Sequence, residues 1–278
     1  MPTTPLPSAI AARRHAFREL HARGCFVIPN PWDIGSARYL ASLGFQALAS
    51  SSAGFAWSQG LADTAVSRDA VLAHLRDIVA ATDLPVNADF ENGFGATPRD
   101  VAQSVRLAVD TGVAGLSIED STGDAGQPIH ALPEAVARLR AAREAIDAAG
   151  GDTLLVGRAE TFLHGRADLA DTIARLRAYA DAGADVLYAP GLKTRDDIAA
   201  VVAAVAPKPL NLLVGGTSDL TLADIAALGV RRVSVGGGLA RSAWGGFMRA
   251  AQSLASLGVF DGFAGAASGA ELNALFGG

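Results

Sequence analysis

The chain has 278 residues, of which 50% are hydrophobic and 18% are charged, and its formal net charge at pH 7 is −5. A chain of this length can bury a large core within one domain. The negative balance, without a block of Lys or Arg, argues against nucleic acid and against an anionic membrane as partners.

Other features of the sequence predict a cytoplasmic protein. No apolar run approaches the roughly 18 residues of a membrane span. The first eight residues contain three prolines and do not resemble a signal peptide. The single cysteine, Cys25, excludes an internal disulfide, fits a reducing compartment and is expected in the core rather than as a reactive thiol.

Eight apolar runs bounded by turn residues predict buried parallel strands. In chain order they are Cys25–Pro29, Gln46–Ser50, Pro85–Asp89, Gly115–Glu119, Leu154–Arg158, Asp185–Ala189, Pro209–Val214 and Arg231–Gly236. Apolar residues at three- and four-residue spacing predict helices between them. These are Asp33–Leu43, Ser67–Ala81, Thr97–Thr111, Pro133–Ala149, Leu169–Ala182 and Thr194–Val205.

Four similar junctions join a helix to the next strand. Each has a glycine after the helix, at Gly44, Gly112, Gly183 and Gly229, where a left-handed conformation would end the helix. Strands alternating with helices in this way predict a (β/α)8 barrel, preceded by an N-terminal helix. We expect one domain over residues 1–278, with its core at about 24–256 and a C-terminal arm at 257–278. The alternative is an open doubly wound sheet, although no Gly-x-Gly-x-x-Gly follows the first strand.

Polar residues collect where the predicted strands end, and the opposite ends carry little chemistry. They are Asn30, Trp32, Ser50–Ser52, Asn87, Asp89, Glu119, Asp120, Arg158, Glu160, Tyr188 and Asn211. The carboxyl ends of barrel strands share one mouth, so acids around one arginine favour a divalent cation and an anionic ligand.

Less specific interpretations stay open for each residue. Asp89 and Glu119 could cap helices or form a structural network with Arg158. The serines could form a plain turn or let a ligand approach backbone N–H groups. Asp63 lies in a long loop where a lid could sit. Gly236–Gly238 could hold a phosphate, as in a phosphosugar barrel, or only form a tight turn.

From about Pro29 to Phe247 the chain resembles the isocitrate lyase and phosphoenolpyruvate mutase superfamily. The resemblance rests on the order and spacing of several short motifs. They are Pro29–Asp33, Ser36–Arg38, Ser51–Gly54, Gly60–Asp63, Asn87–Asp89, Gly93–Gly95, Ile118–Asp120 and Gly157–Glu160.

This resemblance implies a barrel enzyme that forms homo-oligomers, dimers or tetramers, and exchanges a C-terminal helix, for which Ser268–Phe276 is the candidate. It implies Mg²⁺, with Mn²⁺ as an alternative, and a small anionic 2-oxo or 2-hydroxy acid. The implied metal set is Asp63, Asn87, Asp89, Glu91 and Glu119, and the implied catalytic set is Asp63, Glu119 and Arg158. Substrate would contact Trp32, Ser51, Ser52, Ala53, Arg158 and Asn211.

The chain also departs from the family pattern. Asn87 stands where an aspartate would ligate the metal, and Glu91, in an apparent insertion, offers a replacement carboxylate. The segment Ser121–His130 lacks the Cys and Lys of the lyase loop, which argues against cleavage of isocitrate or methylisocitrate. Pro190 replaces the Glu or His that relatives carry after the sixth strand.

We therefore expect a Mg²⁺-dependent lyase that cleaves a C–C bond of a small 2-oxo or 2-hydroxy dicarboxylate through an enolate, by retro-aldol reaction or decarboxylation. Phosphonate P–C mutase or hydrolase chemistry is one alternative. A 2-oxo acid binding protein with little catalysis is the other. His130, Tyr188 and water are open candidates for the proton donor.

Overall fold

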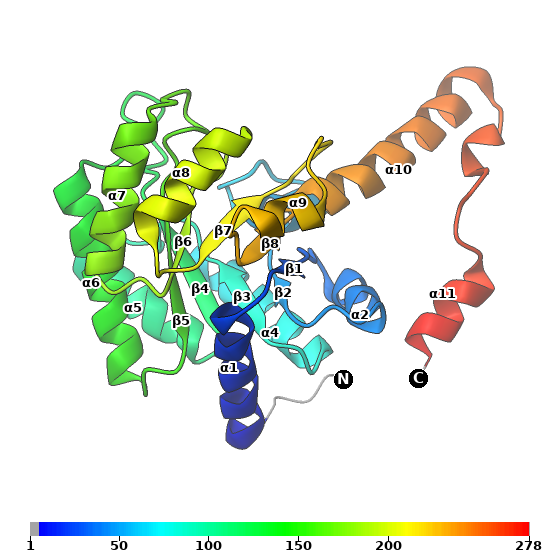
Figure 1. Cartoon of the computed structure of the whole chain (residues 1–278). Helices are drawn as coiled ribbons and strands as arrows, with labels where there is room; N and C mark the ends of the chain where they lie inside the picture. Colours follow the sequence, from blue (N-terminus) through cyan, green and yellow to red (C-terminus); the bar gives the residue numbers. More distant parts are fainter. Residues whose placement is uncertain (1–5, 278) are drawn as a thin grey trace.

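Eight parallel strands form one sheet in the computed structural model, which describes residues 6–277 (Figure 1). Their order around the sheet is β1-β8-β7-β6-β5-β4-β3-β2. The bounds are β1 Phe26–Ile28, β2 Leu48–Ala49, β3 Val86–Asp89, β4 Gly115–Glu119, β5 Leu154–Arg158, β6 Val186–Tyr188, β7 Leu210–Leu213 and β8 Arg232–Ser234. The first strand pairs with the last, and the N–H of Ala49 donates to the carbonyl of Pro29 across the remaining seam at 3.0 Å. The predicted (β/α)8 barrel is confirmed, and the open sheet is excluded.

Helices alternate with the strands and surround them. Their bounds are α1 Pro7–Ala22, α2 Ile34–Ser42, α3 Ser52–Ser58, α4 Arg68–Ala81, α5 Pro98–Val109, α6 Leu132–Ala148, α7 Leu169–Asp181, α8 Arg195–Val205, α9 Leu222–Ala227, α10 Gly238–Leu257 and α11 Gly269–Phe276, with a 3-10 turn η1 at Asp261–Phe263. The N-terminal helix and the six predicted helices are present. The short helices α3 and α9 and the long helix α10 carried no prediction.

The four repeated glycines end helices as the sequence predicts. Gly44, Gly112, Gly183 and Gly229 all have positive φ angles, at 84°, 89°, 101° and 89°. A side chain with a Cβ rarely adopts this conformation, so glycine lets the chain turn directly from helix to strand at these points.

Helix α1 covers the end of the barrel opposite the carboxyl ends of the strands. Its Phe17 is fully buried and packs in a cluster with Phe26, Ile28, Leu154 and Val156 inside the barrel. A larger apolar cluster lies between the strands and the outer helices. Apolar side chains therefore close the amino-terminal end of the strands, and a ligand enters at their carboxyl ends.

The C-terminal arm projects away from the barrel (Figure 1). Helix α10 already leaves the barrel wall, and Phe247 and Phe260 keep 62% and 67% of their surface exposed. The predicted tail helix is present as α11, which lies against α2. Residues 1–5 and 278 of the expected single domain lie outside the described residues. In the part of the chain that the structure describes, no helix is both long and apolar enough to cross a bilayer.

Candidate active site

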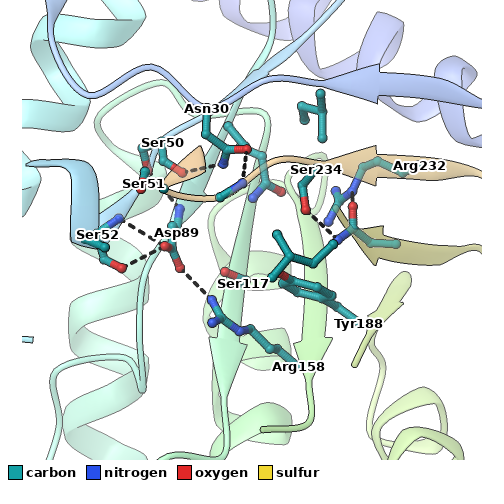
Figure 2. Close-up of a pocket in the computed structure, with 18 of the residues that line it drawn as sticks. Asn30, Ser50, Ser51, Ser52, Asp89, Ser117, Arg158, Tyr188, Arg232 and Ser234 are labelled. Carbon is teal, nitrogen blue, oxygen red and sulfur yellow. Dashed lines mark hydrogen bonds and ion pairs between the residues drawn. The ribbon is translucent and has the colours of Figure 1, made fainter. Parts of the chain in front are cut away.

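A cavity of about 160 Å³ lies inside the barrel and opens where the strands end (Figure 2). Most of its wall comes from inward-facing strand residues, and the segment Ser50–Ala53 and Gly236–Gly237 complete it. The polar residues that line it are Asn30, Ser50–Ser52, Asp63, Asn87, Asp89, Ser117, Arg158, Tyr188, Asn211, Arg232 and Ser234. This is the mouth at which active sites of such barrels lie.

Arg158, the last residue of β5, contacts three carboxylates. Its Nη1 lies 3.0 Å from Oδ1 of Asp89 and 3.3 Å from Oε2 of Glu119, and its Nε donates to Glu160. The guanidinium also lies over the ring of Tyr188, with Cζ 5.0 Å from the ring centroid. Negative charge exceeds positive charge here, so the site can accept a further cation.

Burial, followed by the neighbouring charges, shifts the pKa of several groups here. Burial raises the pKa of Glu119 well above its usual value, although Arg158 opposes the shift. Burial likewise raises the pKa of Glu160. Burial, followed by the charges of Asp89 and Asp63, raises the pKa of Glu91 to about 8. Burial alone would lower the pKa of Arg158, but Glu160 and Glu119 raise it, so the guanidinium stays charged.

Asp89 and the serine segment are tied together. The N–H and the hydroxyl of Ser52 both donate to Oδ2 of Asp89, at 3.0 and 2.8 Å. Ser50 accepts from the N–H of Asp89 at 2.9 Å, and Ser51 caps α3 by accepting from the N–H of Gly54. The N–H of Ser52 thus binds Asp89 in this structure and does not point to a ligand, although the resemblance implies that Ser52 contacts substrate.

Asn30 follows β1 and bridges the seam between β1 and β2, which are not paired in the sheet. Its Oδ1 accepts from the N–H groups of Val235 and Gly236 at 2.9 and 2.8 Å, and its Nδ2 donates to the carbonyl of Ser50 at 3.0 Å. The N–H of Gly238 donates to Val235. Two of the three glycine N–H groups are therefore occupied, which weakens the phosphate-binding interpretation of this turn.

Strand alternation explains why neighbouring acids have different surroundings. Glu119 faces Arg158, whereas Asp120 faces the outer helices. There Asp120 Oδ2 accepts from the Tyr179 hydroxyl at 2.6 Å and from Arg175 Nη1 at 3.1 Å. Its Oδ1 accepts from the N–H of Glu160 at 2.8 Å, so this buried network fixes the residue that pairs with Arg158.

The structure brings most of the predicted site residues to the cavity. Those that line it are Ser51, Ser52, Ala53, Asp63, Asn87, Asp89, Arg158 and Asn211. Asp63 lies at the rim, where partial burial of its carboxyl, followed by the charge of Asp89, raises its pKa. Glu119 reaches the site through Arg158.

Three predicted residues lie outside the cavity wall, namely Glu119, Trp32 and Glu91. Trp32 packs beside Gly54 on α3, where a Cβ on the glycine would come within 2.9 Å of it. Glu91 is buried behind Asp89, and its backbone has a left-handed φ of 46°. None of the three lines the wall in this structure.

Sequence reasoning missed three polar residues of the wall, Ser117, Arg232 and Ser234. Each lies inside a predicted strand rather than after it. Such residues could be found because side chains two positions apart on a strand point to the same face. Ser117, for example, lies two positions before Glu119.

The donor set is compatible with a hard divalent cation. Asn87 and Asp89 both line the cavity, and Oδ1 of Asn87 is a buried amide oxygen without a hydrogen-bond partner. Within residues 6–277, no three acidic, His or Cys side chains converge as a metal cage. One or two protein oxygens completed by water and substrate suit Mg²⁺, which rarely uses an all-protein cage.

The chain as a whole is similar to several known proteins. Residues 17–255 match the family model for phosphoenolpyruvate phosphomutase. An uncharacterised protein of Mycobacterium tuberculosis (strain ATCC 25618 / H37Rv) is 33% identical over 224 residues, covering 80% of this chain and 81% of that one. An oxaloacetate decarboxylase of Bradyrhizobium sp. (strain BTAi1) is 32% identical over 232 residues, covering 81% and 77%.

Solved structures share the whole fold. A protein provisionally described as a lyase/mutase from Burkholderia cenocepacia J2315 is 52% identical, with a TM-score of 0.94 over 97% of this chain and 98% of that one. A phosphonopyruvate hydrolase, solved with oxalate and Mg²⁺, is 27% identical, with a TM-score of 0.84 and 95% of both chains covered.

Proposed function

Because the chain belongs to the phosphoenolpyruvate phosphomutase family, within the isocitrate lyase superfamily of lyases and mutases, we propose that it is a Mg²⁺-dependent lyase for a small 2-oxo or 2-hydroxy dicarboxylate. The proposed reaction breaks a C–C bond and passes through an enolate. The observation that carries the proposal is Arg158, a charged guanidinium that lines a small cavity together with Asp63 and Asp89 and pairs with three carboxylates.

Decarboxylation is the reaction that needs the fewest groups. The bond to the leaving carboxylate breaks, CO2 departs, and the electron pair enters an enolate that is later protonated at carbon. The absence of Cys and Lys from Ser121–His130 is compatible with this route, because no leaving carbanion has to be protonated from that loop. The oxaloacetate decarboxylase relative supports the same choice.

Each chain residue has a proposed task. Arg158 holds a substrate carboxylate through a charge-assisted pair, for which the guanidinium must shift from Asp89 or Glu119. Asn87 and Asp89 would hold Mg²⁺, with Asp63, Glu91 and Glu119 around it. When bound, Mg²⁺ supplies positive charge beside the oxygen atoms on which negative charge develops.

Tyr188 is the proposed proton donor. It lines the cavity, and burial raises the pKa of its hydroxyl to about 12, so the O–H gives up its proton only to a strong base such as an enolate carbon. The hydroxyl would deliver this proton to the enolate carbon, and water would restore it. His130 does not line the cavity, so it is a weaker candidate.

The test is a proton-NMR time course with Mg²⁺ and a panel of oxaloacetate, 2-oxoglutarate, dimethylmalate, methylisocitrate and phosphonopyruvate, with EDTA as control. Metal-dependent conversion of oxaloacetate to pyruvate, lost in Arg158→Met and slowed in Tyr188→Phe at unchanged KM, supports the proposal. Conversion of phosphonopyruvate alone would instead support P–C chemistry, for which the family model is named. Line broadening without any conversion would indicate a binding protein and contradict the lyase proposal.

A further inference from the structure

Arg232, near the floor of the cavity, has no acidic partner. It lies on β8, is only 3% exposed, and lines the same cavity as Arg158. Its Nε donates to Oδ1 of Asn211 at 2.7 Å, and its Nη1 lies 3.4 Å from Nε2 of His21. Within residues 6–277, no carboxylate lies within 4.0 Å of its guanidinium.

The other buried arginines show how unusual this is. Arg138 pairs with Glu134 at 3.0 Å, and Arg175 pairs with Asp120 at 3.1 Å and with Asp171 at 3.0 Å. A buried charge without a partner is costly, and proteins normally pair it or use it to bind a ligand. Arg232 is the one buried arginine among the described residues left without such a pair.

The surroundings of Arg232 are organised rather than accidental. Asn211 uses both ends of its amide, since Nδ2 donates to the Ser234 hydroxyl at 3.0 Å while Oδ1 holds Arg232. Ile28 and Leu213 line the cavity nearby, and their apolar surface limits hydration of the guanidinium. The hydrogen bond at Nε fixes the orientation of the guanidinium and leaves its Nη2 without a protein partner in the described chain.

Strand register connects the two arginines along one wall. Arg158 on β5 pairs with Tyr188 on β6, Tyr188 pairs with Asn211 on β7, and Asn211 pairs with Arg232 on β8. Arg158 ends its strand, whereas Arg232 begins its own, and both side chains line the same cavity (Figure 2). A small molecule with an anionic group at each end would meet both.

We infer that Arg232, held by Asn211 beside Ser234, forms a second carboxylate-binding subsite that receives the distal carboxylate of a dicarboxylic acid whose other end contacts Arg158. This inference rests on the proposed function and assigns the second carboxylate of its dicarboxylate substrate to named residues. Monocarboxylic 2-oxo acids would leave Arg232 unpaired and bind weakly. The subsite determines specificity, and Arg232 takes no part in bond breaking.

The test compares matched acids by isothermal titration calorimetry in the presence of Mg²⁺. The probes are 2-oxoglutarate and 2-oxovalerate, in which a methyl group replaces the distal carboxylate, together with succinate and malate. We expect the wild type to bind 2-oxoglutarate at least about 30-fold more tightly than 2-oxovalerate, since a buried charge-assisted pair discriminates strongly. Arg232→Met should reduce this ratio to within about threefold of unity while leaving the Kd for 2-oxovalerate nearly unchanged, and Arg232→Lys should restore part of the preference.

Thermal unfolding separates this role from a structural one. Removing an unpaired buried charge should leave the Tm of the ligand-free Arg232→Met protein equal to or above that of the wild type. The control Arg138→Met, which breaks a buried ion pair, should lower the Tm and keep the dicarboxylate preference. A dicarboxylate preference that survives in Arg232→Met would overturn the inference. A lower Tm of this variant, together with an equal loss of affinity for 2-oxoglutarate and 2-oxovalerate, would also overturn it.

The outcome also separates this inference from the proposed function. If succinate and malate bind in an Arg232-dependent manner but no oxo acid is converted, the second subsite stands and the lyase proposal fails. If oxaloacetate is converted while Arg232→Met keeps the wild-type KM, the lyase proposal stands and the second subsite is rejected. If the wild type binds none of these dicarboxylates, the inference is wrong.

Discussion

Nη1 of Arg158 lies 3.0 Å from Oδ1 of Asp89, and the two residues come from neither the same strand nor adjacent strands. Asp89 ends β3 and Arg158 ends β5, with Glu119 of β4 between them and also paired to the arginine. Arg158 is thus paired with acids on β3 and β4 and with Glu160 just after β5. A substrate carboxylate must therefore compete with Asp89 and Glu119 for Arg158, and a metal ion would release the arginine by neutralising these acids.

Replacement of Arg158 should be more damaging than loss of one contact suggests. Arg158→Met leaves Asp89, Glu119 and Glu160 without their shared cation and removes the proposed carboxylate clamp. We expect kcat/KM to fall about 100- to 1,000-fold and the free energy of unfolding to fall by about 3 kcal/mol. Steady-state kinetics and urea unfolding measure the two effects.

Arg166→Met is the matched control for this variant. Arg166 is exposed in the loop that follows the same strand, so its replacement should change both quantities little. Activity of Arg158→Met within threefold of the wild type would reject Arg158 as the clamp.

Asn87→Asp should strengthen Mg²⁺ binding at a cost to the metal-free protein. The buried, unpartnered Oδ1 of Asn87 would gain a negative charge beside Asp89, which favours a hard cation but repels the other acids. We expect a lower Tm than wild type in EDTA, recovery in Mg²⁺, and a Kd for Mg²⁺ reduced by about tenfold.

Asn273→Asp adds the same charge on the exposed surface of α11 and should alter neither value. An Asn87→Asp protein that binds Mg²⁺ no more tightly than wild type would show that this amide does not take part in metal binding.

The sequence predicted the barrel because its signals are local. Apolar runs, helical spacing and the glycines after four helices each act within about ten residues, and the positive φ of Gly183 is one such local requirement. The acids at the strand ends were also predictable, since parallel strands must end at one edge.

The interior of the barrel was harder to predict. Strands buried on both faces show no clean alternation, so the pair Arg231-Arg232 does not reveal which side chain points inward. The hydrogen bonds from Ser52 to Asp89 and the left-handed backbone of Glu91 depend on packing between distant segments. These features become visible only when the register of the strands is known.

The C-terminal arm is expected to associate with a second copy of the chain. Phe247 on α10 is 62% exposed, and Phe260 and Phe263 on the arm are 67% and 55% exposed, which is more apolar surface than a monomer normally leaves in water. Light scattering after size exclusion should give a dimer or tetramer for the wild type and a smaller species for Phe247→Glu. Leu222→Glu, which charges an exposed apolar residue on α9, should keep the wild-type mass. A monomeric wild type would contradict this expectation.

His21 should make the barrel sensitive to acid. Burial, followed by the charge of Arg232, lowers the pKa of His21 from 6.5 to about 3, with Arg18 adding a smaller effect in the same direction. A histidine whose folded pKa lies below its unfolded value binds a proton mainly in the unfolded state, so stability falls as pH drops below about 6.5. Because one pH unit corresponds to about 1.4 kcal/mol, His21 should account for up to about 2 kcal/mol between pH 6.5 and pH 5.

Urea unfolding at both pH values tests this effect. The quantity compared is the difference in free energy of unfolding between pH 6.5 and pH 5, because any substitution of a buried histidine also changes the stability at each single pH. His21→Gln should lose most of the wild-type difference, whereas His15→Gln, at an exposed position on the same helix, should keep it. Arg232→Met should reduce the difference partly, since removing the neighbouring positive charge raises the pKa of His21 while its burial persists. An unchanged pH dependence in His21→Gln would mean that His21 has the same pKa in the folded and the unfolded chain, and that burial beside Arg232 does not keep the ring neutral.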